Sequence, residues 1–446
     1  MEHQQARWES DGDAMVVPYY GVQHADDIEE PPPPSAPLLT NSSSSSTDAS
    51  CPSAPKKPRL QSLDVFRGVT MLGMILVDNQ GNFDHVVRPL DESIVRHPAP
   101  PRPPTNARSW VDPADHCAQW DGFAVALAMN GFWDKIPDRR GKIKAWARVL
   151  QRIGTLFVVG LLLNAFGSNP WDKWPHWHFR IMGCRIALCY GTVTVLFLAT
   201  STIVQRVVML CFTAIYVGLM YGLDVPKCGR GNLTPGCNAG GFIDRSIFGD
   251  WMIRPNDPEG LLSTLTATLT CYLGLEFGRI LHKYRANQLE LVCRWVMLAL
   301  GLIGLALFLW LWMPINKKMW SVPFALMMGG IGGLVIFICY YLVDMVLASW
   351  QEDSAWKKAC NAAIQPLIWM GMNPLAIFVL MIFLEILLLD TIHWNGDNLW
   401  NRIYWDVFQS WIVQKELASL VVSFVHVGLW VLFAWGMYTK KWFIKA

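Results

Sequence analysis

A carboxylate and an amide end the first apolar segment, and several histidines follow them in the sequence. Asp78 and Asn79 end that segment, and His85, His97 and His116 lie in the polar stretch that follows it. A neutral imidazole can act as a general base or as a nucleophile, because its pKa lies near neutrality. These residues predict acid–base or group-transfer chemistry at one end of a helix. The alternative for each histidine is a solvated side chain in a loop.

The composition places the protein in a lipid bilayer. Of 446 residues, 52% are hydrophobic and only 16% are charged, whereas soluble domains carry about 25% charge. The net charge of +2 is small and the basic residues are spread between apolar runs, so no nucleic-acid partner is predicted. The 11 cysteines are scattered, which excludes a dense disulfide scaffold, and no metal ligand is predicted. A polytopic membrane protein is the class that remains.

Apolar run length predicts an all-α fold, a polytopic bundle of transmembrane helices. Residues 59–446 form this membrane domain. Residues 1–58 contain a proline run and a serine run without apolar periodicity, which predicts a disordered cytosolic tail. The glycine-rich run 329–333 lies inside a span, where small residues allow close helix packing. Nine runs are long enough to cross the hydrocarbon, which takes about 20 residues, and they are Leu63–Gln80, Ala145–Phe166, Ile181–Thr200, Val204–Gly222, Gly260–Leu281, Leu289–Met313, Ser321–Val346, Ile364–Leu389 and Leu417–Tyr438.

Basic loops and one cysteine pair set the orientation of the spans. Short loops rich in lysine and arginine stay in the cytosol. Such loops precede the second run and follow the fifth and the ninth, so the long loop 223–259 lies in the lumen. This loop contains Cys228, Cys237 and the glycosylation sequence that begins at Asn232. Because the lumen is oxidising, we expect a Cys228–Cys237 disulfide and a glycan on Asn232.

The same reasoning exposes a missing crossing. The first run leads from the cytosol to the lumen, whereas the basic loop 135–148 is cytosolic. Between them, the only apolar segment is Phe123–Phe132, which is too short to span the hydrocarbon as a helix. Either a short segment re-enters the membrane or the chain lacks one helix.

Five segments together resemble the heparan-alpha-glucosaminide N-acetyltransferase family. The resemblance runs from about Gln61 to the C-terminus, and its specificity comes from the ordered set rather than from any one segment. The segments are Ser62-Leu63-Asp64-Val65-Phe66-Arg67-Gly68 with Met74-Ile75-Leu76-Val77-Asp78-Asn79, Trp120-Asp121-Gly122, Phe179-Arg180-Ile181-Met182-Gly183 with Arg185-Ile186-Ala187-Leu188-Cys189-Tyr190, Asp257-Pro258-Glu259-Gly260-Leu261-Leu262-Ser263-Thr264, and Trp369-Met370-Gly371-Met372-Asn373-Pro374.

The resemblance implies a membrane enzyme with a ten-helix core. Such an enzyme passes acetyl from cytosolic acetyl-CoA to the amine of a terminal glucosamine of heparan sulfate type, in the lumen of a lysosome or another endomembrane compartment. The amino sugar and the bilayer would be its partners, and a homodimer stays open. In the family, a further helix follows the element similar to residues 120–122, and its absence here coincides with the missing crossing.

The resemblance also implies roles for individual residues. The reactive histidine of the family precedes the element at residues 120–122, which matches His116 with one residue too many between them. His85 is the rival, and Glu92 occupies a similar position when residues are counted forward from Asn79. Asp78 and Asn79 would lie beside the acetyl group.

Two arginines, Arg180 and Arg185, belong to one of the segments that resemble the family, and we expect them to bind the acetyl donor. The coenzyme phosphates of acetyl-CoA would be neutralised by such side chains. Two other classes of protein stay open. A small-solute transporter would use charges within the spans to line a path. An inactive relative would keep the fold without the chemistry.

Overall fold

The structure is a computed structural model, and it describes residues 60–79, 81, 139–167, 184–234, 236–249, 260–351, 354–394 and 396–444. The chain divides into Met1–Arg59 and Leu60–Ala446, and all the described residues belong to the second unit. The predicted disordered tail and the short segment Phe123–Phe132 therefore lie outside the described residues.

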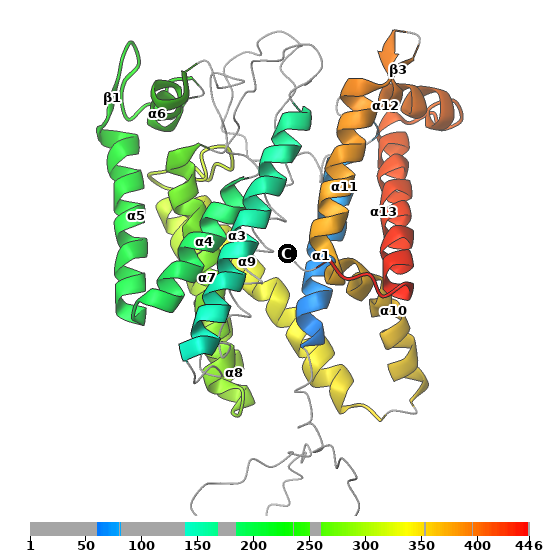
Figure 1. Cartoon of the computed structure of the whole chain (residues 1–446), viewed down its shortest axis with the longest axis horizontal. Coiled ribbons are helices and arrows are strands. Elements are labelled where there is room, and N and C mark those ends of the chain that lie inside the picture. The colour runs from blue at the N-terminus through cyan, green and yellow to red at the C-terminus, as the bar shows by residue number, and fades with distance from the viewer. Residues whose placement is uncertain are drawn as a thin grey trace, which may run out of the picture. The chain divides into compact units, whose positions relative to one another are not determined.

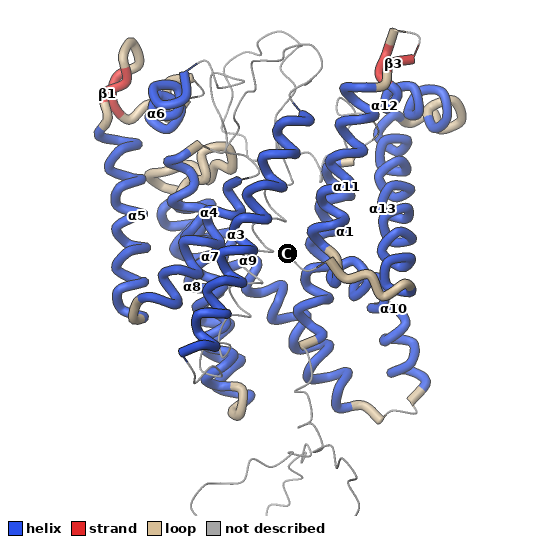
Figure 2. Tube along the Cα trace, viewed as in Figure 1, coloured by secondary structure: helices blue, strands red, loops and turns tan. Residues whose placement is uncertain are grey.

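The described part of the chain is mostly helical, and its strands form only two short antiparallel hairpins (Figure 2). Three segments have π-helical hydrogen bonding and carry the prefix η. The elements in chain order are α1 Gln61–Asp78, α3 Arg139–Gly167, α4 Cys184–Ala199, α5 Thr202–Gly222, β1 Asp224–Val225, β2 Gly229–Arg230, α6 Ala239–Phe248, α7 Leu261–Tyr284, α8 Gln288–Leu309, α9 Val322–Cys339, η5 Tyr340–Leu347, α10 Ala355–Met372, α11 Pro374–Ile386, η6 Leu387–Thr391, β3 His393–Trp394, β4 Asp397–Asn398, α12 Leu399–Arg402, η7 Ile403–Phe408 and α13 Lys415–Thr439.

Five of the described helices are long and apolar enough to span a membrane. They lie within α3, α5, α8, the continuous α9–η5 helix and α13, and the bent pair α10–α11 makes a sixth if it counts as one span. The protein is therefore an integral membrane protein, as predicted, but the predicted count of nine spans is not confirmed.

Charge, length and a break explain why three of the other four predicted spans fall short. Helix α1 carries three charged residues in 18, namely Asp64, Arg67 and Asp78. Helix α4 has 16 described residues, which extend for about 24 Å, less than the hydrocarbon thickness of about 30 Å. The apolar run predicted as one span at Ile364–Leu389 is broken, because α10 and α11 meet at an angle of 74°.

Two groups of contacting helices make up the unit (Figure 1). The first contains α3, α4, α5, α7, α8 and α9, and the second contains α1, α10, α11 and α13. The groups touch where α1 meets α9 and η5, and where α3 meets α11. The carboxylate of Asp344, in η5, accepts a hydrogen bond from the Ser62 backbone N–H at 3.2 Å. This contact satisfies one of the free N–H groups at the start of α1.

Glycines bring helices close together in both groups. In α9, a Cβ atom on Gly330 would lie 2.8 Å from the backbone oxygen of Ala299 in α8. The indole of Trp295, fully buried, donates a hydrogen bond to the Gly333 carbonyl at 2.8 Å. The close packing predicted for the glycine-rich run 329–333 is confirmed.

Helix α1 packs against α10 in the same way. A Cβ atom on Gly68 would lie 2.6 Å from the carbonyl carbon of Leu367, and one on Gly371 would lie 2.7 Å from the carbonyl carbon of Asp64. Backbone therefore rests on backbone at two places along α1. The methionine-rich cluster around Met71 and Met370 fills the space on the α13 side.

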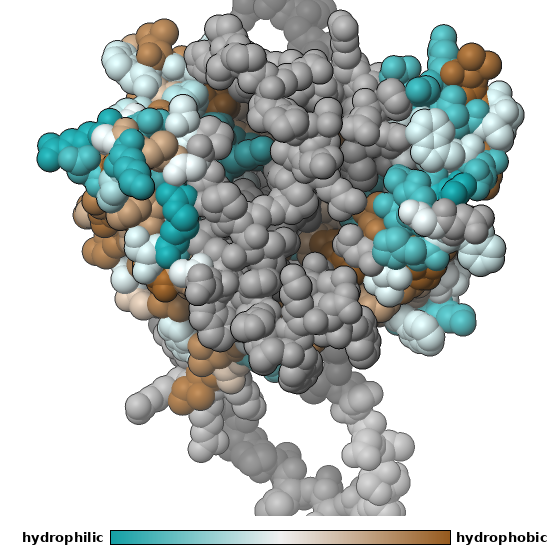
Figure 3. Space-filling model, turned by 90° about the horizontal axis from the view of Figure 1, so that it is seen from above, coloured by the Kyte–Doolittle hydropathy of each residue, from teal (hydrophilic) through white to brown (hydrophobic). Residues whose placement is uncertain are grey.

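One end of the unit is polar. Seen from the end that carries β1 and α12, hydrophilic side chains gather at the outer edges, over the β1–α6 region and over the β3–α12 region (Figure 3). Exposed Trp310 and Trp312 follow α8 near this end, and exposed Trp442 follows α13. Tryptophan at the ends of apolar helices is typical of the two membrane–water interfaces.

Candidate functional site

A buried amide lies where α1 ends. Asn79 is 1% exposed, and its backbone N–H donates to the Ile75 carbonyl at 3.1 Å. Its Nδ2 lies 3.3 Å from the same carbonyl oxygen and 3.3 Å from the sulfur of Met381. Its Oδ1 has no hydrogen-bond partner among the described residues. A buried acceptor without a partner is costly, so Asn79 offers one strong acceptor to a ligand.

A polar stripe on α13 faces this amide. Ser419 and Ser423 are one helical turn apart and fully buried. The Ser423 hydroxyl donates to the Asn79 carbonyl oxygen at 3.1 Å, and the Gly81 N–H donates to the Ser419 carbonyl oxygen at 3.3 Å. The chain is therefore tied to α13 on both sides of residue 80. His426, 8% exposed, continues the stripe toward the middle of α13.

An aromatic cap covers the same place from α12 and η7. The Trp400 indole donates to the Gly81 carbonyl at 3.2 Å, and its ring centroid lies 5.2 Å from that of His426. A Cβ atom on Gly81 would lie 2.6 Å from the ring of Tyr404. Residue 81 must be glycine for this cap to close.

The hydroxyl of Tyr404 anchors the cap to the loop before α13. It lies 3.0 Å from both Gln409 Oε1 and the Lys415 carbonyl oxygen. Burial raises the pKa of the Tyr404 hydroxyl above its usual value, and the nearby Glu416 carboxylate raises it further. The phenol therefore stays protonated and keeps its role as a donor.

The geometry suits recognition of a polar group at the end of α1. An amide oxygen can accept a hydrogen bond from an amine, and buried dipoles act strongly because the surroundings have a low dielectric constant. The Ser423 hydroxyl already donates to the Asn79 carbonyl oxygen. The imidazole of His426 is the one described titratable side chain in this group of Asn79, Ser419, Ser423, Trp400 and His426.

Only part of this cluster was predicted from the sequence. Asn79 is in it, and Asp78 ends α1, although only the backbone of Asp78 is described. His85 and His116 lie outside the described residues, as do Glu92 and His97. The predicted roles of these residues stay predictions.

Several residues of the cluster were missed as site residues. The signal for Ser419 and Ser423 was their spacing of four on an apolar helix, since polar residues within a span usually have a function or a polar partner. The same signal marks His426, a polar residue within the apolar run 417–438. Nothing local marked Trp400, because tryptophan is common at interfaces.

A second buried group surrounds Arg185 in α4. This arginine is 4% exposed, its Nη2 donates to the Ser263 carbonyl at 3.1 Å, and its guanidinium lies 4.2 Å from the ring centroid of Trp320. Its Nε and Nη1 are buried and have no partner among the described residues. A guanidinium with two free N–H directions can bind a phosphate or carboxylate. Arg180, predicted to act with it, lies outside the described residues.

The loop between α5 and α6 carries the predicted disulfide and sequon. Cys228 and Cys237 are joined in a disulfide with a Cα–Cα distance of 5.5 Å. The Asn232 Oδ1 accepts hydrogen bonds from the Thr234 backbone N–H at 3.0 Å and from its hydroxyl at 2.6 Å. Whether Asn232 carries a glycan stays a prediction.

Segments that are far apart in the sequence meet in pairs. Residues 62–79 pack against residues 369–374, where Gly371 contacts the backbone of Asp64. Residues 185–190 contact residues 260–264, through Arg185 with Ser263 and through the Cys189 thiol with the Thr264 carbonyl at 3.9 Å. Four of the five segments singled out by their sequence thus form two contacting pairs.

Comparison with known proteins points to one family. No protein-family model matches the chain. The chain is 24% identical over 461 aligned residues to heparan-alpha-glucosaminide N-acetyltransferase of Homo sapiens, which covers 87% of this chain and 60% of that protein. It is 24% identical over 457 residues to the Mus musculus protein of the same name, with the same coverage. The chain thus spans about 60% of the length of these relatives. It is a distant relative of the heparan-alpha-glucosaminide N-acetyltransferases.

Proposed function

We propose that this protein is a membrane acetyltransferase that moves acetyl from acetyl-CoA to the amine of a terminal glucosamine. The observation that carries the proposal is the pairing of the family-like segments, residues 62–79 with 369–374 and residues 185–190 with 260–264. Segments that share a function are expected to meet in space. Distant similarity over 87% of the chain supports the same proposal.

The acceptor amine is assigned to the cluster at the end of α1. The free Oδ1 of Asn79 accepts a hydrogen bond from the amine of the sugar. A base takes one proton from the amine, the nitrogen attacks the thioester carbon, and the C–S bond breaks as the C–N bond forms. The thiolate of coenzyme A leaves and is then protonated. His116 or His85, on the same side of the membrane, is the base.

The acetyl donor is assigned to Arg185. Two of its guanidinium nitrogens are buried without a partner among the described residues, and the carbonyl oxygens of a donor that reaches across from the cytosol would satisfy them. Trp320 holds the guanidinium in place through ring contact at 4.2 Å. Arg180, five residues earlier in the sequence, would add a second charge.

The sides of the membrane follow from the basic loops and the disulfide loop. The amino sugar is on the side of the β1–β2 hairpin, in an endomembrane lumen such as that of the lysosome, and the donor enters from the cytosol. In this orientation the end of α1 would be lumenal, and Asn79 would contact the amino sugar there.

The test is acetyl transfer in membranes that contain the full chain. Radiolabelled acetyl-CoA is added with glucosamine, and labelled N-acetylglucosamine is counted. Asn79→Ala should lower the rate by about 10²–10³-fold, the usual cost of losing a polar group that contacts the reacting atoms. Met381→Leu is the matched control, because it removes the sulfur next to Nδ2 and leaves the amide. It should keep normal activity, since Met and Leu have similar volume.

Single histidine variants identify the base. One of His116→Ala and His85→Ala should abolish transfer while thermal stability stays normal. His426→Ala is the third variant, because His426 is the imidazole within the described cluster. A wild-type chain that forms no N-acetylglucosamine under these conditions overturns the proposal, and so does an Asn79→Ala variant with full activity.

A further inference from the structure

The ends of α7 and α8 project beyond the start of α5. Arg206, on the first turns of α5, makes two hydrogen bonds with the Glu276 carboxylate at 3.0 and 3.1 Å. Glu276 lies eight residues before the end of α7 at Tyr284, so α7 continues for about 12 Å past this level. The candidate span α5 begins at Thr202, four residues or about 6 Å before Arg206. About 6 Å of α7 therefore projects past the start of α5, which is similar to the thickness of the headgroup layer, about 5–7 Å on each side.

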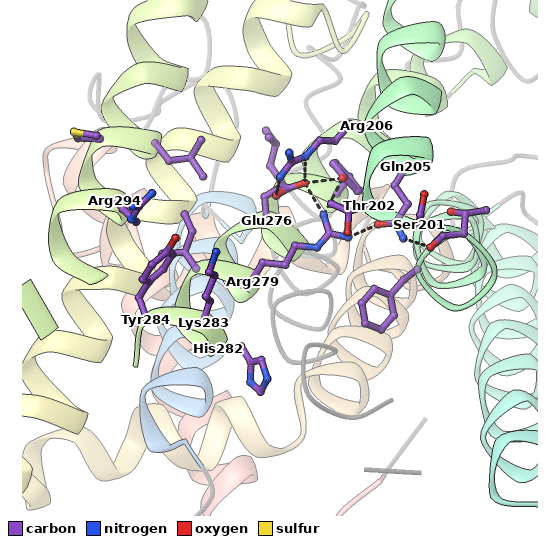
Figure 4. A pocket seen from close by; sticks show the side chains of 17 residues that line it. Ser201, Thr202, Gln205, Arg206, Glu276, Arg279, His282, Lys283, Tyr284 and Arg294 are labelled. Carbon is purple, nitrogen blue, oxygen red and sulfur yellow. Dashed lines mark hydrogen bonds and ion pairs between the residues drawn. The ribbon is translucent and has the colours of Figure 1, made fainter. Parts of the chain in front are cut away.

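A pocket of about 1240 Å³ opens beside this projection, between α5 and α8 (Figure 4). The turn before α5 forms one edge of it, and the last turns of α7 form its floor. Among the residues that line it, Glu276 is the only carboxylate, and the basic side chains are Arg206, Arg279, His282, Lys283 and Arg294. The pocket therefore has an excess of positive charge.

Both oxygens of the Glu276 carboxylate accept hydrogen bonds inside the pocket. In addition to Arg206, it accepts hydrogen bonds from Arg279 and from the Tyr272 hydroxyl, both at 2.6 Å. Arg279 also donates to Gln205. This network fixes two arginines in place, and it leaves no free carboxylate oxygen to attract further cations.

Two exposed cations lie at the mouth of the pocket. The Lys283 ammonium lies 5.2 Å, and the Arg294 guanidinium 4.4 Å, from the ring centroid of Tyr284. Arg294 is also paired with Glu290 at 2.8 Å. Both positive groups therefore lie beside the same ring at the mouth of the pocket. Apolar side chains, Met297 and Leu298 among them, line the pocket on the α8 side.

We propose that this pocket binds the headgroup of an anionic glycerophospholipid from the cytosolic leaflet. Lys283 and Arg294 bind its phosphate at the mouth of the pocket, and its acyl chains follow the apolar side of α8. Basic pockets between transmembrane helices on the cytosolic side bind anionic headgroups by the same combination of charge and depth. This proposal is independent of the acetyl transfer assigned to the other end of the bundle.

The test is crosslinking of a photoactivatable phosphatidylserine to the full chain in phosphatidylcholine vesicles. The double variant Lys283→Gln/Arg294→Gln removes the two cations at the mouth. Crosslinking to α7 and α8 should fall by about fivefold for each cation, hence about 25-fold for the pair. Lys440→Gln/Lys441→Gln is the matched control, because it removes two exposed cations after α13, away from the pocket. This control should crosslink like the wild type.

Competition separates the ligands that share a phosphate. Unlabelled phosphatidylserine should displace the probe from the protein in phosphatidylcholine vesicles, whereas coenzyme A should not. Displacement by coenzyme A would assign the pocket to the acetyl donor and overturn the proposal. Failure of unlabelled phosphatidylserine to displace the probe, or unchanged crosslinking in the Lys283→Gln/Arg294→Gln variant, would also refute it.

Discussion

The contact between α1 and α10 at Gly68 predicts the effect of a single added methyl group. In the variant Gly68→Ala, the new Cβ atom would lie 2.6 Å from the carbonyl carbon and 2.7 Å from the Cα atom of Leu367. Carbon atoms in contact are normally about 3.5–4.0 Å apart. The obstacle is backbone, which cannot rotate away, so the two helices must separate by about 1 Å.

The separation affects both stability and activity. Overpacking of this kind costs about 1–3 kcal/mol. For a large chain this corresponds to a fall in Tm of about 2 °C per kcal/mol, hence about 2–6 °C. The same shift moves the end of α1, where Asn79 is held by Ser423. A misplacement of about 1 Å can lower an enzyme's rate by about 10²-fold.

The assay measures thermal unfolding of the detergent-solubilised protein together with acetyl transfer in membranes. Gly73→Ala is the control on the same helix, because no atom lies within 4 Å of a Cβ at that position. It should match the wild type in both measurements. If Gly68→Ala also melts and reacts like the wild type, then α1 and α10 do not approach as closely as the structure has them, and this reasoning is refuted.

Three other predictions concern the disulfide loop between α5 and α6 and the cap formed by α12. Glycosidase treatment should shift the mobility of the wild type and of Thr234→Ser but not of Thr234→Val, because only the first two keep the hydroxyl that donates to Asn232. A shift in all three would place the glycan elsewhere. Cys228→Ser breaks the disulfide and should lower the free energy of unfolding by about 2–3 kcal/mol through loop entropy, whereas Cys211→Ser, which changes an exposed free cysteine, should not. Equal Tm values for the two variants would contradict a structural disulfide. Trp400→Phe removes the donor to the Gly81 carbonyl, so it should lower the free energy of unfolding by about 1–3 kcal/mol and reduce acetyl transfer. Trp394→Phe, at an exposed position, should change neither, and a Trp400→Phe variant without effect would mean that the cap does not hold residue 81.

Run length predicted well those helices that face lipid over most of their surface. The predicted run Val204–Gly222 corresponds to α5 at Thr202–Gly222, and Leu417–Tyr438 corresponds to α13 at Lys415–Thr439. An apolar surface on nearly every side leaves an uninterrupted run in the sequence, so its ends can be read directly.

The break between α10 and α11 could not be predicted in the same way. Residues 364–389 are a continuous apolar run, yet the chain turns by 74° at Asn373. Pro374 disfavours a helical conformation at the preceding residue, and the buried Asn373 side chain accepts a hydrogen bond from the Ile444 N–H at 3.0 Å. The proline was visible in the sequence, but the partner that stabilises the turn is 71 residues away.

Only those residues of the candidate site that have a local sequence signal could be predicted. Asn79 was identified because it ends a helix with a family-like motif. Its contacts with Ser423 and, through Gly81, with Trp400 cross more than 300 residues of sequence. Such pairings depend on how the helices pack, which a single sequence does not specify.

The packing of α1 depends on helices that are synthesised much later than α1 itself. Helix α1 carries Asp64, Arg67 and Asp78, and it packs against α10 and α13, which the ribosome makes much later. About 280 residues separate the end of α1 from the start of α10, so at about 5–20 residues per second α10 follows α1 after about 15–60 s. During that time, its charges face either lipid, at a cost of several kcal/mol, or a protein that shelters them. Insertion of α1 should therefore depend on an intramembrane chaperone or on delayed release from the translocation channel, and shortening the wait by moving α10 closer in the sequence should reduce that dependence.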